Sequence, residues 1–275
     1  MHDIVANGAS IPALGFGTFR MSGAEVAEVL PAALAQGFRH VDTAQIYKNE
    51  AAVGAAIAAS GVARDQIFLT TKVWVTNFAA DRFGASVEES LTKLGTDHVD
   101  LLLLHWPGGS DVPRDAQIEA LNKVQARGLT RHIGVSNYTV AQMDEAIRLS
   151  DAPLIINQVE YHPYLSQAAL LAAAKARGLS LTAYFSLADG KVAQDPVLRE
   201  IGAAHGKTAA QVALRWLVQQ PGVAALTKTA RVARLPENVA IFDFALSEAE
   251  MAAIHALARP DGRIVNPEGL APVWD

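Results

Sequence analysis

The sequence predicts an α/β fold, a (β/α)8 (TIM) barrel formed by one domain over residues 1–275. Eight short apolar runs alternate with alanine-rich amphipathic stretches, as parallel strands do when helices connect them. Hydrophobic residues make up 51% of the 275 residues and charged residues 19%, which is enough apolar surface for a large buried core. Eight repeats are the number that closes this kind of barrel.

The predicted strands are continuous apolar runs, which is typical of strands buried on both faces. They cover residues 14–18, 38–42, 67–72, 99–105, 132–136, 154–159, 179–184 and 223–227. Helices are predicted over residues 24–36, 51–59, 82–94, 114–127, 140–149, 167–177, 197–218 with a break near Gly206, and 234–239, and another over 247–258 follows the last repeat.

Glycines mark the ends of five predicted helices, where a residue with positive φ is favoured: Gly37, Gly61, Gly95, Gly128 and Gly178. Residues 2–13 contain two β-prone pieces around Asn7-Gly8, a pair typical of a tight hairpin turn. We expect this N-terminal β-hairpin to cover the bottom of the barrel. A short C-terminal loop follows the last helix.

A doubly wound nucleotide-binding fold is the main alternative for such an alternation, and it would carry a G-x-G-x-x-G turn after an early strand. Gly15-Phe16-Gly17 is the nearest match, but Thr18-Phe19-Arg20 follows it without a third glycine. The barrel is therefore favoured. A bound nucleotide would have to be held without that turn.

Composition excludes several classes of function. The net charge of −5 gives no electrostatic reason for a nucleic-acid partner or an anionic membrane surface. The chain has no cysteine, which excludes thiolate nucleophiles and sulfur-ligated metals. Its most apolar runs, 101–104 and 168–174, are far shorter than the roughly 20 residues that cross a bilayer. With no secretory signal visible, we expect a cytoplasmic protein.

Polar residues close the predicted strands, at the end of a barrel where catalytic groups lie. These residues are Asp42, Lys72, His105, Ser136 with Asn137, Gln158, Tyr184 and Lys228, and Tyr47 follows Asp42 by five positions. Each of them alone is explained more readily by a structural role. Their convergence on one rim favours function, because coupled charges there are costly to bury.

The chemistry of this group suits carbonyl reduction. Burying Lys72 requires a carboxylate partner, and Asp42 on the neighbouring strand is the nearest candidate. A cation beside a phenol is expected to lower the pKa of Tyr47 from about 10 toward the working pH, which would make it a usable acid. His105 could donate a hydrogen bond to a carbonyl oxygen in the same pocket.

Four segments carry a resemblance to the aldo-keto reductase family: residues 41–50 (VDTAQIYKNE), 71–74 (TKVW), 104–107 (LHWP) and 134–138 (GVSNY). The resemblance runs nearly end to end. It implies that Tyr47 is the general acid, that Lys72 and Asp42 tune it, and that His105 orients the substrate carbonyl.

The same resemblance implies a nicotinamide cofactor. Ser136, Asn137 and Gln158 would bind its carboxamide and Tyr184 would stack on its ring, with Leu187 in the following loop. The adenosine 2′-phosphate and adenine would contact Lys228, Thr229, Arg234 and Asn238. Two cations converging on a dianion would favour NADPH over NADH. Thr227 and Arg231-Val232 depart from the usual family pattern, so the loop around that phosphate is expected to differ in shape.

Residues 44–47, 187–191 and the tail 261–275 look closest to the bacterial 2,5-diketo-D-gluconate reductase B branch, whose members are also described as methylglyoxal reductases. Small dicarbonyls such as methylglyoxal and keto sugar acids such as 2,5-diketo-D-gluconate are the expected substrates. They would bind against Phe19, Trp74, Trp106 and Trp274, while Arg20 is expected to face solvent.

We expect a monomer with no metal. Two alternatives stay open: a barrel that binds cofactor as a sensor with negligible turnover, and a metal-assisted hydrolase on the same fold.

Overall fold

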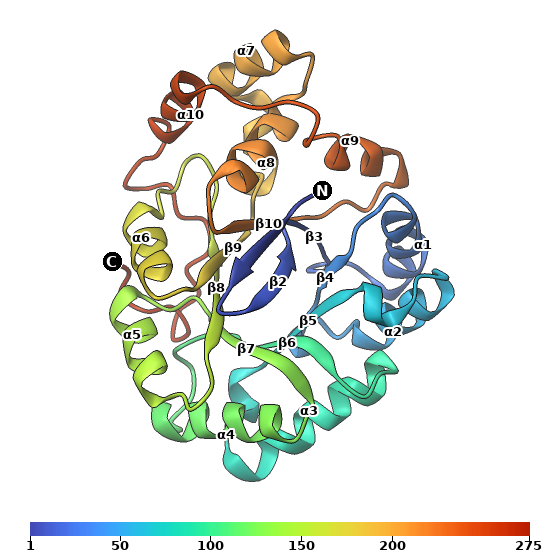
Figure 1. Cartoon of the computed structure of the whole chain (residues 1–275), viewed down its shortest axis with the longest axis vertical. Coiled ribbons are helices and arrows are strands. Elements are labelled where there is room, and N and C mark those ends of the chain that lie inside the picture. Colours follow the sequence, from blue (N-terminus) through green and yellow to red (C-terminus); the bar gives the residue numbers. More distant parts are fainter.

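A computed structural model describes the whole chain, residues 1–275. Eight parallel strands form a closed barrel in the order β10-β3-β4-β5-β6-β7-β8-β9, and helices surround it (Figure 1). The strands are β3 (Leu14–Gly17), β4 (His40–Asp42), β5 (Phe68–Val73), β6 (Val99–Leu104), β7 (Thr130–Ser136), β8 (Leu154–Glu160), β9 (Ser180–Tyr184) and β10 (Val223–Thr227). The predicted fold and all eight predicted strands are confirmed.

The helices lie between the strands and after the last one. They are α1 (Gly23–Ala35), α2 (Glu50–Ala59), α3 (Ala80–Leu94), α4 (Arg114–Ala126), α5 (Val140–Leu149), α6 (Ala168–Ala176), α7 (Pro196–His205), α8 (Ala209–Gln219), α9 (Leu235–Val239) and α10 (Glu248–His255). Short 3₁₀ turns are η1 (Gln45–Tyr47), η2 (Arg64–Gln66), η3 (Val75–Asn77), η4 (Ala188–Gln194) and η5 (Val232–Arg234). None of the helices is both long enough and apolar enough to cross a membrane.

The start of β4 differs from the sequence prediction for a local reason. Strand β4 begins at His40 rather than at residue 38, because the Phe38 amide still donates to the Ala33 carbonyl of α1. The predicted break in helix 197–218 is confirmed. Gly206 has φ +65° and the Lys207 amide donates to the Gly202 carbonyl, which ends α7 before α8 starts.

The predicted N-terminal hairpin consists of β1 (Asp3–Ala6) and β2 (Ala9–Pro12), and it lies across one end of the barrel (Figure 1). Asn7 and Gly8 form its turn with φ +41° and +86°. The Asn7 side chain donates to the carbonyl of Leu154, the first residue of β8, at 2.7 Å. The hairpin therefore covers the amino ends of the strands, as expected.

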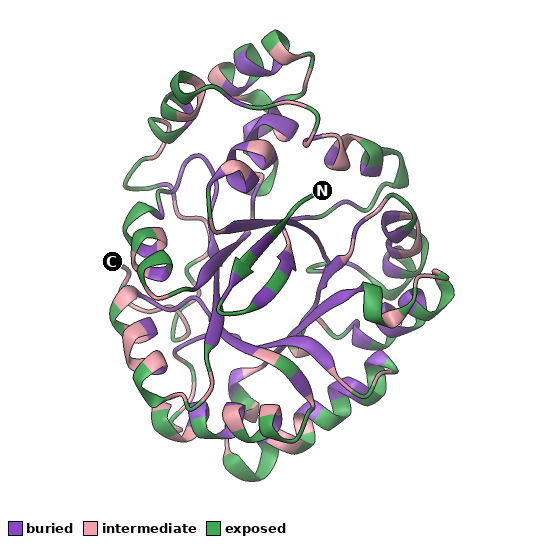
Figure 2. Ribbon diagram, viewed as in Figure 1, coloured by how far each residue is buried: buried purple, intermediate pink, exposed green.

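The barrel strands are buried, while the outward faces of the helices are exposed (Figure 2). Charged and polar side chains of the predicted site lie at the carboxyl ends of the strands. There Asp42, Lys72 and Gln158 are each at most 2% exposed. Because the hairpin closes the opposite end, these polar groups reach solvent only through the carboxyl-end opening.

Candidate active site

A cavity of about 780 Å³ opens at the carboxyl ends of the strands. It brings together residues that are far apart in the chain. The predicted site residues on its lining are Phe19, Asp42, Tyr47, Trp74, His105, Trp106, Ser136, Asn137, Gln158, Tyr184, Leu187, Lys228, Thr229 and Arg234.

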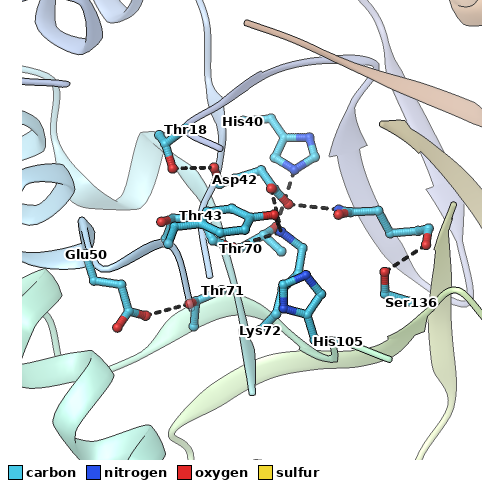
Figure 3. Close-up of polar contacts among 12 residues, drawn as sticks. Thr18, His40, Asp42, Thr43, Glu50, Thr70, Thr71, Lys72, His105 and Ser136 are labelled. Atoms are coloured by element: carbon cyan, nitrogen blue, oxygen red, sulfur yellow. Dashed lines mark hydrogen bonds and ion pairs between the residues drawn. The ribbon is translucent and has the colours of Figure 1, made fainter. Parts of the chain in front are cut away.

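Lys72 lies directly beneath this lining and forms an ion pair with Asp42 (Figure 3). The Lys72 Nζ atom is 2.6 Å from Asp42 Oδ1, and the two side chains are 0% and 3% exposed. Lys72 also donates to the Thr43 carbonyl at 2.9 Å, and Gln158 donates to the other carboxylate oxygen of Asp42 at 2.8 Å. Burial lowers the pKa of Lys72, and the Asp42 carboxylate opposes that shift. Side chains from three strands, β4, β5 and β8, therefore hold the ion pair in place.

Tyr47 ends the turn η1, which follows β4, and its hydroxyl lies 3.4 Å from Lys72 Nζ. The expectation that Lys72 lowers the pKa of Tyr47 is wrong. Burial, and after it the negative charge of Asp42, raises the pKa of Tyr47 well above its ordinary value. The larger cause is burial, which disfavours the charged phenolate, and the nearby Asp42 carboxylate adds to it. Tyr47 is therefore a protonated phenol at neutral pH.

His105 follows β6, and its ring meets those of Tyr47 and Trp74 edge to face, at centroid distances of 5.8 and 5.2 Å. Burial, with a smaller contribution from the Lys72 charge, holds the pKa of His105 well below its ordinary value. The imidazole is therefore neutral at pH 7 and carries a single N–H donor.

On the side of the cavity formed by β7 and β9, hydrogen bonds fix the side chains of Ser136, Asn137 and Tyr184. The Tyr184 hydroxyl donates to Asn137 Oδ1 at 2.7 Å, and Asn137 Nδ2 donates to the His105 carbonyl at 3.0 Å. Ser136 donates to the Gln158 carbonyl at 2.8 Å. These bonds fix the ring of Tyr184 at the cavity and link it to the strand end that carries His105.

Exposed charged residues line the end of the cavity next to β10. Lys228, Arg231 and Arg234 are all exposed, and no carboxylate forms an ion pair with any of them. The sequence prediction named Arg231 only as a departure from the family pattern that changes the shape of the loop, and not as a residue of the cavity. Arg20 is exposed, as expected, but it also lines the cavity and lies 3.9 Å from Asp189 across the opening. An unpaired cationic end of this kind suits an anionic ligand.

Besides Lys72, which lies beneath the lining, two predicted site residues are not part of the cavity lining, Trp274 and Asn238. The Trp274 Nε1 donates to Asn266 at 2.8 Å, and the Arg263 guanidinium lies 3.5 Å from the centre of the Trp274 ring. Asn238 shares the buried face of the short helix α9 with Leu235, and for that reason it does not line the cavity.

Sequence reasoning missed the part of the tail that does line the cavity, namely Val265, Pro267 and Leu270. The buried carboxylate of Glu160, at the end of β8, accepts hydrogen bonds from the amides of Ile264 and Val265 at 2.7 and 2.8 Å. A carboxylate ending a continuous buried strand was the available indication that some distant backbone binds there.

The chain is similar to known proteins over nearly its whole length. A sequence profile described as the aldo/keto reductase family matches residues 13–259. Methylglyoxal reductase DkgB of Salmonella typhimurium is 44% identical over 268 residues, which are 97% of this chain and all of that protein. Glyoxal reductase of Bacillus subtilis is 40% identical over 265 residues, covering 96% of this chain and 95% of that protein.

Two solved structures extend the comparison. One is a crystal structure of a protein proposed to be a 2,5-diketo-D-gluconic acid reductase B, with 67% identity and a TM-score of 0.99 over 100% of this chain and 98% of that one. The other is aldose reductase from Schistosoma japonicum, with 32% identity and a TM-score of 0.88 over 95% and 94%.

Proposed function

Because this chain belongs to the aldo/keto reductase family, we propose that it reduces aldehydes and ketones to alcohols with NADPH, and that Tyr47 supplies the proton. The observation that carries the proposal is the geometry at the cavity. The Tyr47 hydroxyl lies 3.4 Å from Lys72 Nζ, and Lys72 is itself held by the buried carboxylate of Asp42.

Reduction of a carbonyl needs a hydride at carbon and a proton at oxygen. When bound, the reduced nicotinamide supplies the hydride. The N–H of neutral His105 and the hydroxyl of Tyr47 orient the carbonyl oxygen, and Tyr47 protonates the alkoxide that develops there. The raised pKa of Tyr47 keeps the phenol in its acid form before the reaction. The ammonium of Lys72 then stabilises the phenolate that remains.

The cavity residues suit the cofactor in both charge and shape. Ser136, Asn137 and Gln158 present amide and hydroxyl groups beside Tyr184, which offers a fixed aromatic face for the nicotinamide, and Leu187 lies in the next loop. At the cationic end, Lys228, Thr229 and Arg234 suit a 2′-phosphate, which supports NADPH rather than NADH.

The substrate end is apolar and suits small carbonyl compounds. Phe19, Trp74 and Trp106 line it together with the tail residues Val265 and Leu270. The names of the relatives given above support methylglyoxal as a substrate of this chain and 2,5-diketo-D-gluconate as a second one. We also propose that the chain is active as a monomer and that the reaction takes place in the cytoplasm.

Steady-state assays test this proposal. The purified chain is given NADPH or NADH with methylglyoxal, glyoxal or 2,5-diketo-D-gluconate, and oxidation of the cofactor is followed by absorbance. We expect turnover with methylglyoxal and a larger kcat/KM with NADPH. Quenching of tryptophan fluorescence by NADPH without turnover of any carbonyl would instead identify a cofactor-binding sensor and overturn the enzymatic assignment.

A further inference from the structure

We propose that Gln45 is a positioning residue that holds Tyr47 and Trp74 at fixed positions relative to each other. The inference rests on the proposed function of Tyr47 as proton donor. Gln45 opens the turn η1 that ends at Tyr47, and its half-buried side chain points away from the cavity toward η3 and α3. Its carboxamide contacts both of these elements.

The oxygen of this carboxamide binds the segment that carries Trp74. Gln45 Oε1 accepts a hydrogen bond from the Trp74 amide at 2.8 Å and another from Asn77 Nδ2 at 2.9 Å. Trp74 lines the cavity, and its ring packs edge to face on His105. One side-chain oxygen therefore links the turn of the proposed acid to the aromatic wall of the pocket.

The nitrogen of the same carboxamide binds helix α3. Gln45 Nε2 donates to the Ser86 carbonyl at 3.1 Å and lies 3.2 Å from the hydroxyls of both Ser86 and Ser90. A carboxamide offers two N–H donors and one oxygen with two lone pairs, so every group of Gln45 has a partner. Reversing the amide would set its N–H groups against the Trp74 amide. Only one orientation therefore satisfies the site.

The network continues to the strand that carries Lys72. Ser90 donates to Glu50 at 3.3 Å. Glu50 in turn accepts from Thr71 at 2.6 Å, a bond drawn in Figure 3. Thr71 immediately precedes Lys72 on β5. Gln45 thus connects the turn bearing the phenol to the same framework that fixes the ammonium beside it.

Precise placement matters here because the contact between Tyr47 and Lys72 is long. At 3.4 Å it is near the limit for a hydrogen bond, so a small outward movement of η1 breaks it. The hydrogen bonds of the turn's own backbone are local, from Tyr47 to Ala44 and from Lys48 to Gln45. These bonds do not fix the turn against β5 or α3. The carboxamide of Gln45 does.

The test replaces Gln45 with leucine, which keeps the size of the side chain and removes all of its hydrogen bonds. We expect kcat with methylglyoxal to fall at least tenfold, while the Kd for NADPH stays within twofold. We also expect the solvent deuterium isotope effect on kcat to rise, because proton transfer from a displaced Tyr47 becomes slower. A purely structural role would lower stability without changing that isotope effect.

Gln219→Leu is the matched control. Gln219 is also half-buried, and its carboxamide donates to the Leu246 carbonyl and accepts from the Leu246 amide, far from the cavity. We expect its kcat and isotope effect to stay within twofold of the wild-type values. If Gln45→Leu fails to fold, Asn77→Ala removes one donor to Oε1 and should shift both quantities in the same direction by a smaller factor.

A folded Gln45→Leu chain with kcat and isotope effect within twofold of wild type would overturn this inference and leave the proposed function intact. A wild-type chain that reduces no carbonyl would overturn the proposed function, and this inference with it.

Discussion

Two ion pairs at the same end of the barrel differ in almost every physical respect. Lys72 and Asp42 are 2.6 Å apart on adjacent strands, with side chains 0% and 3% exposed. Arg20 and Asp189 are 3.9 Å apart on loops, with side chains 60% and 62% exposed. The first pair belongs to the proposed catalytic side of the cavity, and the second lies across its opening.

The difference in burial between the two ion pairs determines how rigidly each is held. A charge buried in the barrel must keep its partner, and its position is fixed by sheet register. Exposed charges on loops interact weakly through solvent and can adjust to a ligand. Arg20 and Asp189 also both have positive φ, +58° and +55°, a backbone conformation that most residues disfavour. The buried ion pair beside Tyr47 is thus held by strands, whereas the exposed pair across the opening is held by loops.

Removing the buried cation should have the largest effect. Lys72→Met leaves the Asp42 carboxylate buried without its ammonium, which should lower the free energy of unfolding by about 3–5 kcal/mol. Reduction should slow about 100-fold or more, because the phenolate loses its stabilising charge. Urea unfolding and steady-state kinetics measure the two effects. The double variant Asp42→Asn/Lys72→Met should recover stability but not activity, and recovery of both would contradict the assignment.

Removing the exposed cations should have a smaller and selective effect. We expect Lys228→Ala/Arg234→Ala to raise the Kd for NADPH about 10- to 100-fold, because charge-assisted hydrogen bonds are worth about 1.5–3 kcal/mol each before solvent screening. The Kd for NADH should change less than threefold. Fluorescence titrations measure both constants, and an equal loss for the two cofactors would refute the 2′-phosphate assignment.

The buried histidine predicts how stability depends on pH. Burial depresses the pKa of His105 in the folded chain, so below the ordinary histidine value of about 6.5 the unfolded chain binds one more proton than the folded chain. The free energy of unfolding should therefore fall as pH drops from 6.5 to 5, by at most about 1.4 kcal/mol per pH unit from this group. Comparing wild type with His105→Gln isolates the effect from other titrating groups. Identical slopes for the two proteins would show that His105 titrates normally.

Breaking the exposed pair should have the smallest effect. Asp189→Asn keeps the size of the side chain and removes its charge, and we expect the free energy of unfolding to change by less than about 1 kcal/mol. Urea unfolding at low and high salt is the measurement. A decrease of 3 kcal/mol or more in the free energy of unfolding would show that the exposed pair stabilises the fold as much as the buried pair does.

The sequence predicted those parts of the molecule that depend on local pattern. The strands were identified because each is an apolar run, and Asp42, Lys72 and His105 were identified because they close such runs. Val265 was missed as a cavity residue because the path of the tail depends on hydrogen bonds to a distant carboxylate, Glu160. The predicted direction of the Tyr47 pKa shift was wrong because the shift depends on how deeply the phenol is buried and on its distance from the Asp42 carboxylate. Both depend on three-dimensional packing.

The central claim is that the phenol of Tyr47 gives the proton in carbonyl reduction. Single-turnover reduction of methylglyoxal by the NADPH-loaded chain, compared between wild type and Tyr47→Phe, tests it most directly. We predict a rate lower by about 10²- to 10⁴-fold, the usual contribution of a general acid, with the Kd for NADPH unchanged. A Tyr47→Phe rate within tenfold of wild type would show that another group supplies the proton.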